Sequence, residues 1–292
     1  MAPALAVGDW AGEDVSVAEI ERALSAAREA AAADGPDLRT SVMTHLAWVP
    51  EEWLGAARAT LAGLAERHPS RTILLTPDPE AADGLDAAVS LRSFAVEGVP
   101  RMVCSEVVEL RLRGGHASAP ASVVLPLLLS DLPVFCRWRG RPPFGAAPFR
   151  QLLGVVDRLV VDSSEWPDVP AAYSELAGVF GEAAVSDIAF GRSLPWRVRL
   201  AALWPGIASL SGLEVVGPDA DALLLAGWLR SRLGTKVELL RREAPALTRV
   251  AVDGADVAPP DDPPPTPSDL LSAELDVFGR DPVYESAAVA AK

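Results

Sequence analysis

The chain has 292 residues, of which half are hydrophobic and 23% are charged, so its composition supports a full-sized core and excludes wholesale disorder. Asp and Glu number 40 against 26 Lys and Arg, which gives a formal net charge of −14 at pH 7. A general nucleic-acid-binding protein needs a broad cationic face, so the charge balance argues against that class while leaving room for a local basic patch.

Short apolar strands alternate with helices in the first half of the chain. We expect residues 1–14 to form a loose tail, and the Ala-rich segment Val15–Ala33 that follows has the composition of a helix. A second helix is predicted from Pro50, whose fixed φ suits a first helical turn, to about Arg67. The predicted strands are Thr40–Val49, Arg71–Thr76, Ala87–Val96, Met102–Arg113, Pro133–Arg137 and Arg158–Asp162. Further helices are predicted at Ser118–Ser130, interrupted by Pro126, and at Ala147–Asp157. This alternation predicts an α/β fold in which helices flank a mostly parallel sheet.

The second half predicts a smaller α/β domain. A strand at Leu213–Val216 precedes the clearest helix of the chain, which begins after Pro218 and ends at Gly234. Proline dominates residues 258–267, which predicts an extended linker. Two more strands are predicted at Thr235–Leu240 and Leu247–Val252, and helices at Pro170–Phe180, Pro195–Trp204, Ser268–Leu275 and Pro282–Ala291. We therefore divide the chain into an N-terminal α/β domain (15–165), a helical connection (166–204) and the smaller α/β domain (205–292).

The N-terminal segment, the apolar stretches and the cysteine content indicate in which compartment the protein is found. Met1–Asp14 lacks the basic and apolar regions of a secretion signal, and no apolar stretch approaches the roughly 20 residues that span a bilayer. Cys104 and Cys136 are too few for a disulfide framework or a four-cysteine zinc site, and each is expected to be a small buried hydrophobe. We expect a cytoplasmic protein without a membrane partner.

Known catalytic motifs do not match this sequence. It has no dinucleotide-binding fingerprint, no phosphate-binding P-loop and no Gly-x-Ser-x-Gly element. The three histidines, His45, His68 and His116, are not spaced to share a helix face as metal ligands. We expect no catalytic set, no metal and no cofactor. One alternative remains at Gly114-Gly115, a turn between a strand and a helix whose N–H groups could hold an anion beside His116.

Two acid-free stretches combine arginine with aromatic residues. One lies between Asp131 and Asp157 and the other spans Ile188–Leu213. Planar guanidinium groups and aromatic rings are typical of protein interfaces. The same composition could also bind a phosphorylated ligand or a nucleic acid, or these arginines could pair with the chain's own carboxylates. The candidate partner-binding residues are Arg137, Trp138, Arg139 and Arg141 in or beside the first stretch, and Asp187, Arg192, Trp196 and Arg197 in or beside the second.

Residues 187–197 carry a family resemblance. They read Asp-Ile-Ala-Phe-Gly-Arg-Ser-Leu-Pro-Trp-Arg, which is similar to the D-x-x-W-x-R-L-x-P-W-R signature of the glucose-6-phosphate dehydrogenase assembly proteins, the OpcA family. Phe190 stands where the signature has tryptophan. Asp187, Arg192, Pro195, Trp196 and Arg197 are the positions that match. Supporting similarity occurs in the same order at Thr44–Pro50, His68–Leu75, Ser105–Arg111, Val123–Leu129, Leu271–Asp276 and Asp281–Glu285.

The resemblance implies a non-catalytic accessory protein. Such a protein binds glucose-6-phosphate dehydrogenase and promotes its assembly or activity, as an allosteric activator, in the oxidative pentose phosphate pathway. The alternative hypothesis is an enzyme that binds a sugar phosphate or nucleotide through the Gly114-Gly115 turn and the Arg137–Arg141 loop.

Overall fold

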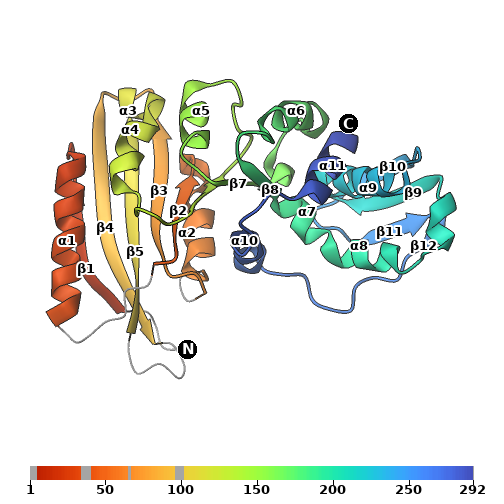
Figure 1. The fold of residues 1–292 in the computed structure, drawn as a ribbon, viewed down its shortest axis with the longest axis horizontal. Helices are drawn as coiled ribbons and strands as arrows, with labels where there is room; N and C mark the ends of the chain where they lie inside the picture. Colours follow the sequence, from red (N-terminus) through yellow and green to blue (C-terminus); the bar gives the residue numbers. More distant parts are fainter. Residues whose placement is uncertain (1–4, 34–40, 65–66, 96–101, 292) are drawn as a thin grey trace. The chain divides into compact units, whose positions relative to one another are not determined.

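The computed structural model describes residues 5–33, 41–64, 67–95 and 102–291 (Figure 1). Its contacts divide the chain into two compact units, Met1–Leu159 and Val160–Lys292, and each is described by itself. The predicted division into residues 15–165, 166–204 and 205–292 stays a prediction. Among the described residues, none of the helices is both long and apolar enough to cross a lipid bilayer.

A mostly parallel sheet confirms the predicted α/β class. Its strand order is β1-β4-β5-β3-β2-β6-β7-β8. The pairs β2–β3, β2–β6 and β3–β5 are parallel, whereas β4 runs antiparallel to both β1 and β5. The strands are β1 (Leu5–Gly12), β2 (Met43–Trp48), β3 (Ser70–Asp78), β4 (Gly84–Ala95), β5 (Met102–Arg113), β6 (Val134–Trp138), β7 (Arg158–Val161) and β8 (Ala184–Asp187).

Strand β1 overturns one prediction. The loose tail predicted for residues 1–14 is wrong for residues 5–12, which pair antiparallel with β4, and residues 1–4 lie outside the described residues. The segment has the sequence LAVGDWAG, with few β-branched residues, so its own propensity for a strand is weak. Pairing with the long strand β4 determines its conformation instead.

Helices pack on both faces of the sheet in the first unit. Helix α1 (Val17–Ala33) buries Ile20, Leu24, Ala27 and Ala31, which recur at the spacing of one helix face, against β1 and β4. On the opposite face of the sheet, α2 (Leu54–Ala62) packs over Leu74 and neighbouring residues, after the 3-10 turn η1 (Glu51–Trp53).

The helix predicted at Ser118–Ser130 is broken into short pieces. The structure has α3 (Gly115–Ser118), α4 (Pro120–Val124) and the 3-10 turn η2 (Leu125–Leu127). Pro120 begins α4 after the break at Ala119, and Pro126, which lacks an N–H, lies where α4 gives way to η2, as the predicted interruption requires. The remaining helix of the unit is α5 (Ala147–Leu153), which is shorter than predicted because Gly154 ends it.

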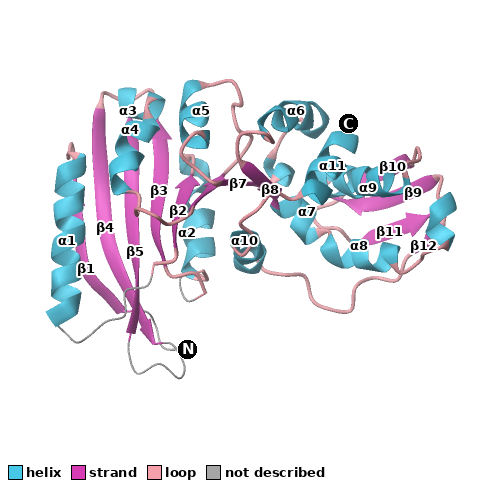
Figure 2. Cartoon of the chain, viewed as in Figure 1, coloured by secondary structure: helices cyan, strands magenta, loops and turns pink. Residues whose placement is uncertain are grey.

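The second unit contains a four-stranded sheet in the order β10-β9-β11-β12 (Figure 2). Strand β9 (Gly212–Gly217), helix α9 (Asp219–Leu233), β10 (Glu238–Glu243) and β11 (Arg249–Val252) have the predicted strand–helix–strand–strand order, and β12 (Ala255–Asp256) adds a short edge. Strand β10 begins and ends three residues later than the predicted Thr235–Leu240. Gly234 ends α9 in the left-handed conformation, with φ of 66°. The other helices are α6 (Val169–Leu176), α7 (Ile188–Arg192), α8 (Leu194–Ala201), α10 (Pro267–Leu275) and α11 (Pro282–Ala290).

Helix α9 lies between the sheet and α11. Its residues Ala222, Leu225 and Leu229 pack against Leu213 and Val215 of β9 in the main apolar core of this unit. On its other side α9 contacts α11. Gly227 permits this approach, because a Cβ at that position would overlap the carbonyl oxygen of Ala287. The core of the second unit therefore depends on the C-terminal helix as well as on the sheet.

Candidate functional site

The segment 187–197 begins with a buried carboxylate. Asp187 ends β8 and caps α7: its Oδ1 accepts hydrogen bonds from the backbone N–H groups of Ala189, at 2.9 Å, and Ser163, at 3.0 Å. The hydroxyl of Tyr284 donates to Oδ2 at 3.4 Å. Ser163 opens the 3-10 turn η3 (Ser163–Glu165) and Tyr284 lies on α11, so one carboxylate connects three parts of the second unit.

Burial changes the acidity of this carboxylate. The side chain of Asp187 is 1% exposed, and this burial, with the nearby charge of Asp162, raises its pKa to about 7. The hydrogen bonds from Ser163 and Ala189 oppose the rise. Asp187 therefore exchanges its proton near neutral pH.

Arg192 lies at the centre of an ion-pair network. Its Nε and Nη2 donate to the two carboxylate oxygens of Asp221, each at 3.1 Å, in the bidentate geometry that makes such pairs strong. Nη2 also donates to Ser164 Oγ at 3.0 Å and to Asp162 Oδ1 at 3.3 Å. Burial alone would lower the pKa of Arg192, but the carboxylates of Asp162 and Asp221 raise it above its ordinary value.

This network is one that sequence reasoning missed. Asp221 is fully buried in the first turn of α9, and Asp162 follows β7. An aspartate early in a helix usually stabilises the helix end from the surface, so the sequence signals only a helix start there. The pairing with Arg192 ties α7 to α9 and to η3, and it makes the signature arginine a structural anchor.

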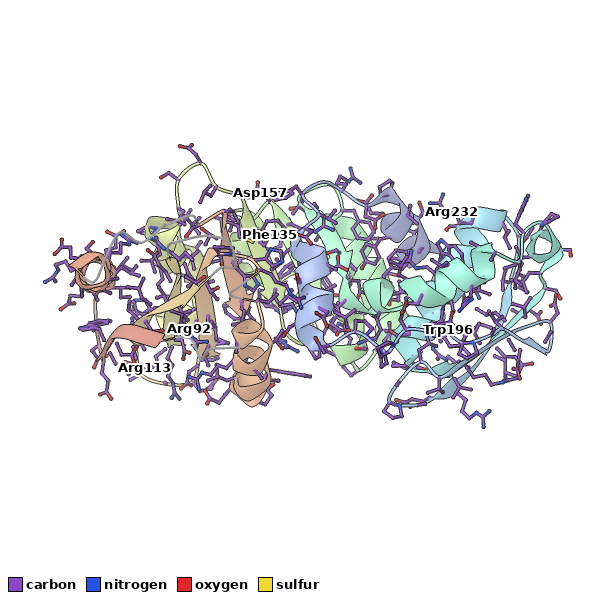
Figure 3. All side chains as sticks on the ribbon, turned by 90° about the horizontal axis from the view of Figure 1, so that it is seen from below. Arg92, Arg113, Phe135, Asp157, Trp196 and Arg232 are labelled. Carbon is purple, nitrogen blue, oxygen red and sulfur yellow. The ribbon has the colours of Figure 1, made fainter. Side chains whose placement is uncertain are left out.

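Trp196 and Arg197 extend the buried part of the segment. Trp196, which Figure 3 labels, is 5% exposed and belongs to the apolar core that contains Leu200 and Leu225. The guanidinium of Arg197 lies 3.6 Å from the centre of the Phe190 ring, and its Nη2 donates to the Phe190 carbonyl oxygen at 3.0 Å. Burial lowers the pKa of Arg197 to about 10. The phenylalanine that replaces the signature tryptophan at position 190 thus contacts this arginine through both its ring and its carbonyl group.

The opposite side of α8 is apolar and exposed. Leu194 and Val198 are 52% and 59% exposed and lie four residues apart, on one face of the helix. Leu203 and Trp204 follow in the turn after α8, and Trp204 is 66% exposed. We call these four residues the α8 face. Contiguous exposed apolar side chains often mark a contact surface for another protein, and Leu194 and Val198, one helical turn apart, are the contiguous pair of the α8 face. The spacing of Leu194 and Val198 is the sequence signal that could have identified it.

In the first unit, the predicted residues Arg137 and Trp138 are buried within β6. They are 3% and 2% exposed, respectively. The Trp138 ring stacks on Trp48 of β2, with centroids 4.7 Å apart, and meets the edge of Phe149 of α5. Arg137 donates from Nη1 to the carbonyl of Trp138. These side chains belong to the core of the first unit.

Arg139 and Arg141 follow β6 and are only partly buried. The Arg139 guanidinium lies over the Trp53 ring at 5.6 Å and donates to Thr60 Oγ1 at 3.4 Å. Both contacts are to η1 and α2, so Arg139 holds the loop after β6 against its neighbours. Of the candidate residues in the first unit, Arg139 and Arg141 are the two with exposed surface, and direct contact of any of the eight candidates with a partner stays a prediction.

The Gly114-Gly115 turn already contains a carboxylate. The N–H of Gly115 donates to Asp83 Oδ1 at 2.6 Å, and Gly114 adopts a positive φ of 52°. A phosphate at this turn would meet the negative charge of Asp83 where it needs a donor. The geometry therefore does not favour the phosphate-binding alternative. The described residues contain no group of three or more His, Cys, Asp and Glu side chains placed to hold a metal ion.

Two further groups have the properties of core residues. Burial raises the pKa of Cys136 to about 12, so its thiol stays protonated, as predicted for a small buried hydrophobe. The side chain of Cys104 lies outside the described residues. Burial lowers the pKa of His45 to about 4, and the charges of His68 and Arg137 lower it further, so its ring is neutral at pH 7.

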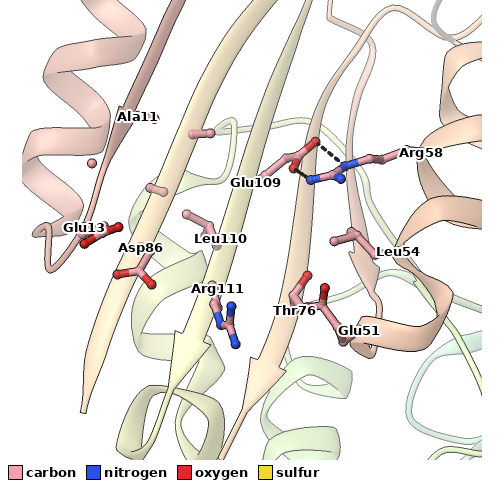
Figure 4. A pocket seen from close by; sticks show the side chains of 13 residues that line it. Ala11, Glu13, Glu51, Leu54, Arg58, Thr76, Asp86, Glu109, Leu110 and Arg111 are labelled. Atoms are coloured by element: carbon pink, nitrogen blue, oxygen red, sulfur yellow. Dashed lines mark hydrogen bonds and ion pairs between the residues drawn. The ribbon is translucent and has the colours of Figure 1, made fainter. Parts of the chain in front are cut away.

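An open groove of about 770 Å³ lies on the side of the first sheet that α2 covers only partly (Figure 4). Alanine and leucine side chains form much of its floor, and Arg58 of α2 pairs with Glu109 of β5 at its wall. Arg111, also at the groove, pairs with Asp78. Its arginines are thus neutralised by the chain's own carboxylates, so the groove does not form an anion site.

The second unit thus has a buried polar network on one side of α8 and exposed apolar side chains on the other. Comparisons with known proteins identify the family. The family described as glucose-6-phosphate dehydrogenase subunit N-terminal domain matches residues 62–178, and the corresponding C-terminal domain matches residues 183–260. The chain belongs to the OpcA family.

Curated relatives carry the same family name. The OxPP cycle protein OpcA of Synechocystis sp. is 26% identical over 231 residues, which cover 75% of this chain and 48% of the relative. The protein of that name from Synechococcus elongatus is 28% identical over 182 residues, 59% of this chain and 41% of the relative. The chain thus spans about half the length, or less, of these relatives. No solved structure matches the chain significantly.

Proposed function

We propose that this chain is a non-catalytic subunit of glucose-6-phosphate dehydrogenase that promotes the assembly or activity of the enzyme in the oxidative pentose phosphate pathway. The observation that supports this most is the signature segment. It ties α7 and α8 into the second unit and leaves the α8 face, Leu194, Val198, Leu203 and Trp204, exposed. Both matching family descriptions name the dehydrogenase.

The candidate residues then have two kinds of role. Asp187 and Trp196 are buried, so they contribute to binding by fixing the position of α8, and Arg192 does the same through Asp221. Arg197 also holds α8, through its contact with Phe190, and because it is only partly buried it stays a candidate for direct contact with the dehydrogenase. Arg139 and Arg141 are the corresponding candidates in the first unit.

Activation by such a subunit requires a difference in affinity. The chain shifts the dehydrogenase toward its competent state only if it binds that oligomer or conformation more tightly than the others. A rigid contact surface serves this purpose, because it loses little conformational freedom on binding.

The proposal is tested with the purified chain and the dehydrogenase of the same organism. Size-exclusion chromatography with light scattering detects the complex, and the rate of NADP reduction is measured across a titration of the chain. We expect a co-eluting complex and a change in rate that saturates. Separate elution and an unchanged rate, with both proteins at micromolar concentration, would contradict the proposed function.

A further inference from the structure

Strand β10 is an edge of the four-stranded sheet. It pairs in parallel with β9 on one side, and no strand lies on its other side within the described part of the chain. Edge strands present unpaired N–H and C=O groups, and they offer a template on which another strand can pair.

The hydrogen bonds to β9 show which groups of β10 face outward. The N–H of Glu238 donates to Ser211 and that of Ala244 donates to Gly217, so the even-numbered residues point their backbone groups at β9. The backbone groups of Leu239, Arg241 and Glu243 therefore point to the free edge. At the start of the strand, the carbonyl of Val237 accepts from the Arg230 guanidinium, so the free stretch begins at Leu239.

The side chains of the even residues lie on the open side of the sheet. Leu213 and Val215 of β9 face α9 and are buried, whereas Leu240 and Arg242 are paired with Glu214 and Val216 on the opposite side. There, Leu240 is 67% exposed and lines a shallow groove of about 260 Å³. An apolar side chain so exposed at the middle of an edge strand is a liability for solubility unless it is covered.

The charges of β10 are arranged for self-association. The strand reads Glu-Leu-Leu-Arg-Arg-Glu and is neutral, in a chain whose net charge of −14 otherwise makes two copies repel each other. The side chains on the open side of the sheet also form a self-complementary pattern. Glu238 lies two residues before Leu240 and Arg242 two residues after it, so opposite charges flank the leucine symmetrically.

We propose that a second copy of this chain pairs antiparallel with β10 around a twofold axis through Leu240. Leu240 then lies opposite its own copy, at a position where paired side chains approach closely, and Glu238 of each copy faces Arg242 of the other. Leu239 and Arg241 become a hydrogen-bonded pair, which requires outward-facing backbone groups on both residues, and both have them. The twofold symmetry closes the assembly as a dimer.

Neighbouring registers do not share these properties. An axis through Arg241 places that residue opposite itself and Leu240 opposite Arg242. An axis through Leu239 places Glu238 opposite Leu240. Charge and apolar contact therefore select the register centred on Leu240. This proposal concerns the chain alone and does not depend on the proposed function.

Charge-reversal variants test whether β10 pairs with a second copy of the chain and whether the pairing is centred on Leu240. The full-length chain is examined by light scattering over a range of micromolar concentrations, with circular dichroism and thermal unfolding as controls for folding. We expect the wild type to approach twice its mass of 30.7 kDa as its concentration rises. Glu238→Arg and Arg242→Glu each place like charges across the axis and weaken the dimer about tenfold or more. The double variant Glu238→Arg/Arg242→Glu exchanges the charges and restores it.

Arg22→Glu is the matched control, because it reverses a charge of the same sign on the exposed surface of α1. It is expected to leave the dimer unchanged. The proposal is overturned if the wild type stays monomeric throughout, if the single variants dimerise as it does, or if the double variant fails to regain the dimer while remaining folded. The proposal is also overturned if the wild type is monomeric and the single variants lose binding to the dehydrogenase. The partner that pairs with the free edge of β10 would then be the dehydrogenase.

Discussion

Residues 137–141 and residues 187–199 both bring arginine and tryptophan together, yet they present them differently. In the first segment, Trp138 belongs to β6, an interior strand of its sheet, and is buried between Trp48 and Phe149. In the second segment, Trp196 is equally buried, but it lies on a helix whose other side exposes Leu194 and Val198. A strand inside a covered sheet buries both of its faces, whereas a helix at the surface buries only one.

The difference shows where a contact surface can lie. Both segments are enriched in arginine and tryptophan. In the second segment, the most exposed side chains are the apolar neighbours of these residues, Leu194 and Val198. The first segment offers Arg139 and Arg141, which lie beyond the end of the strand. Enrichment of a residue type thus identifies a segment, and the type of secondary structure decides which of its side chains reach a partner.

The largest expected effect tests the buried network of the second segment. Arg192→Met leaves the buried carboxylates of Asp221 and Asp162 without their cation, so we expect it to lower the free energy of unfolding by about 3–5 kcal/mol. Arg199→Met is the control on the same stretch, because Arg199 pairs with the largely exposed Asp261 and should cost about 1 kcal/mol or less. Equilibrium unfolding in urea measures both. Similar losses in the two variants would show that Arg192 is not an anchor.

A comparable test applies to the first segment. Trp138→Ala removes the stacking on Trp48 and leaves a cavity beside Phe149, so a loss of about 3 kcal/mol is expected. Arg141→Ala, at a partly buried position in the loop beyond the strand, should lower the free energy of unfolding by about 1 kcal/mol or less. If the arginine variant were the less stable of the two, the described packing of this segment would be wrong.

A dependence of the free energy of unfolding on pH is expected from the second segment, because it contains the buried Asp187. Asp187 has a folded-state pKa of about 7 against an ordinary value of 3.8. At a pH between these two values, the native state keeps a proton that the unfolded chain has lost. Its contribution to the free energy of unfolding therefore falls as the pH rises from about 4 to 7, by about 1 kcal/mol per pH unit. Asp187→Asn has no proton to exchange. We expect the stability of the wild type relative to this variant to decrease between pH 5 and pH 7, and parallel profiles would contradict the assignment.

The smallest effect on stability is expected at the α8 face. Leu194→Asn and Val198→Asn replace side chains that are more than half exposed, so each should alter the free energy of unfolding by about 0.5 kcal/mol or less. Thermal unfolding of the double variant checks this. A large loss of stability would mean that these side chains pack inside the second unit rather than facing outward.

Part of this architecture could be predicted from the sequence because the signals are local. Pro218 and Gly234 set the ends of α9, and the strand before it, β9, is short and apolar. Strand β1 was not predicted, because its residues have weak strand propensity and depend on β4 for pairing. The interruption predicted at Pro126 is present, whereas the earlier break at Ala119, before Pro120, was not predicted.

The site was predictable only in outline. The resemblance at residues 187–197 identified Asp187, Arg192, Trp196 and Arg197, but not what they contact. Arg192 does not pair with the neighbouring Asp187; its partners are Asp162 and Asp221, about 30 residues away in either direction, and only the fold brings them together. The exposure of Leu194 depends in the same way on which side of α8 faces the core.

The central claim is that the α8 face binds glucose-6-phosphate dehydrogenase. Titration of the dehydrogenase with the wild type, with Leu194→Asn/Val198→Asn, and with the matched control Leu125→Asn/Val289→Asn tests it most directly. The control replaces two apolar side chains of similar exposure elsewhere on the surface. We predict that the α8 variant binds at least about tenfold more weakly than the wild type while the control binds equally well. Equal binding by all three proteins would contradict the claim.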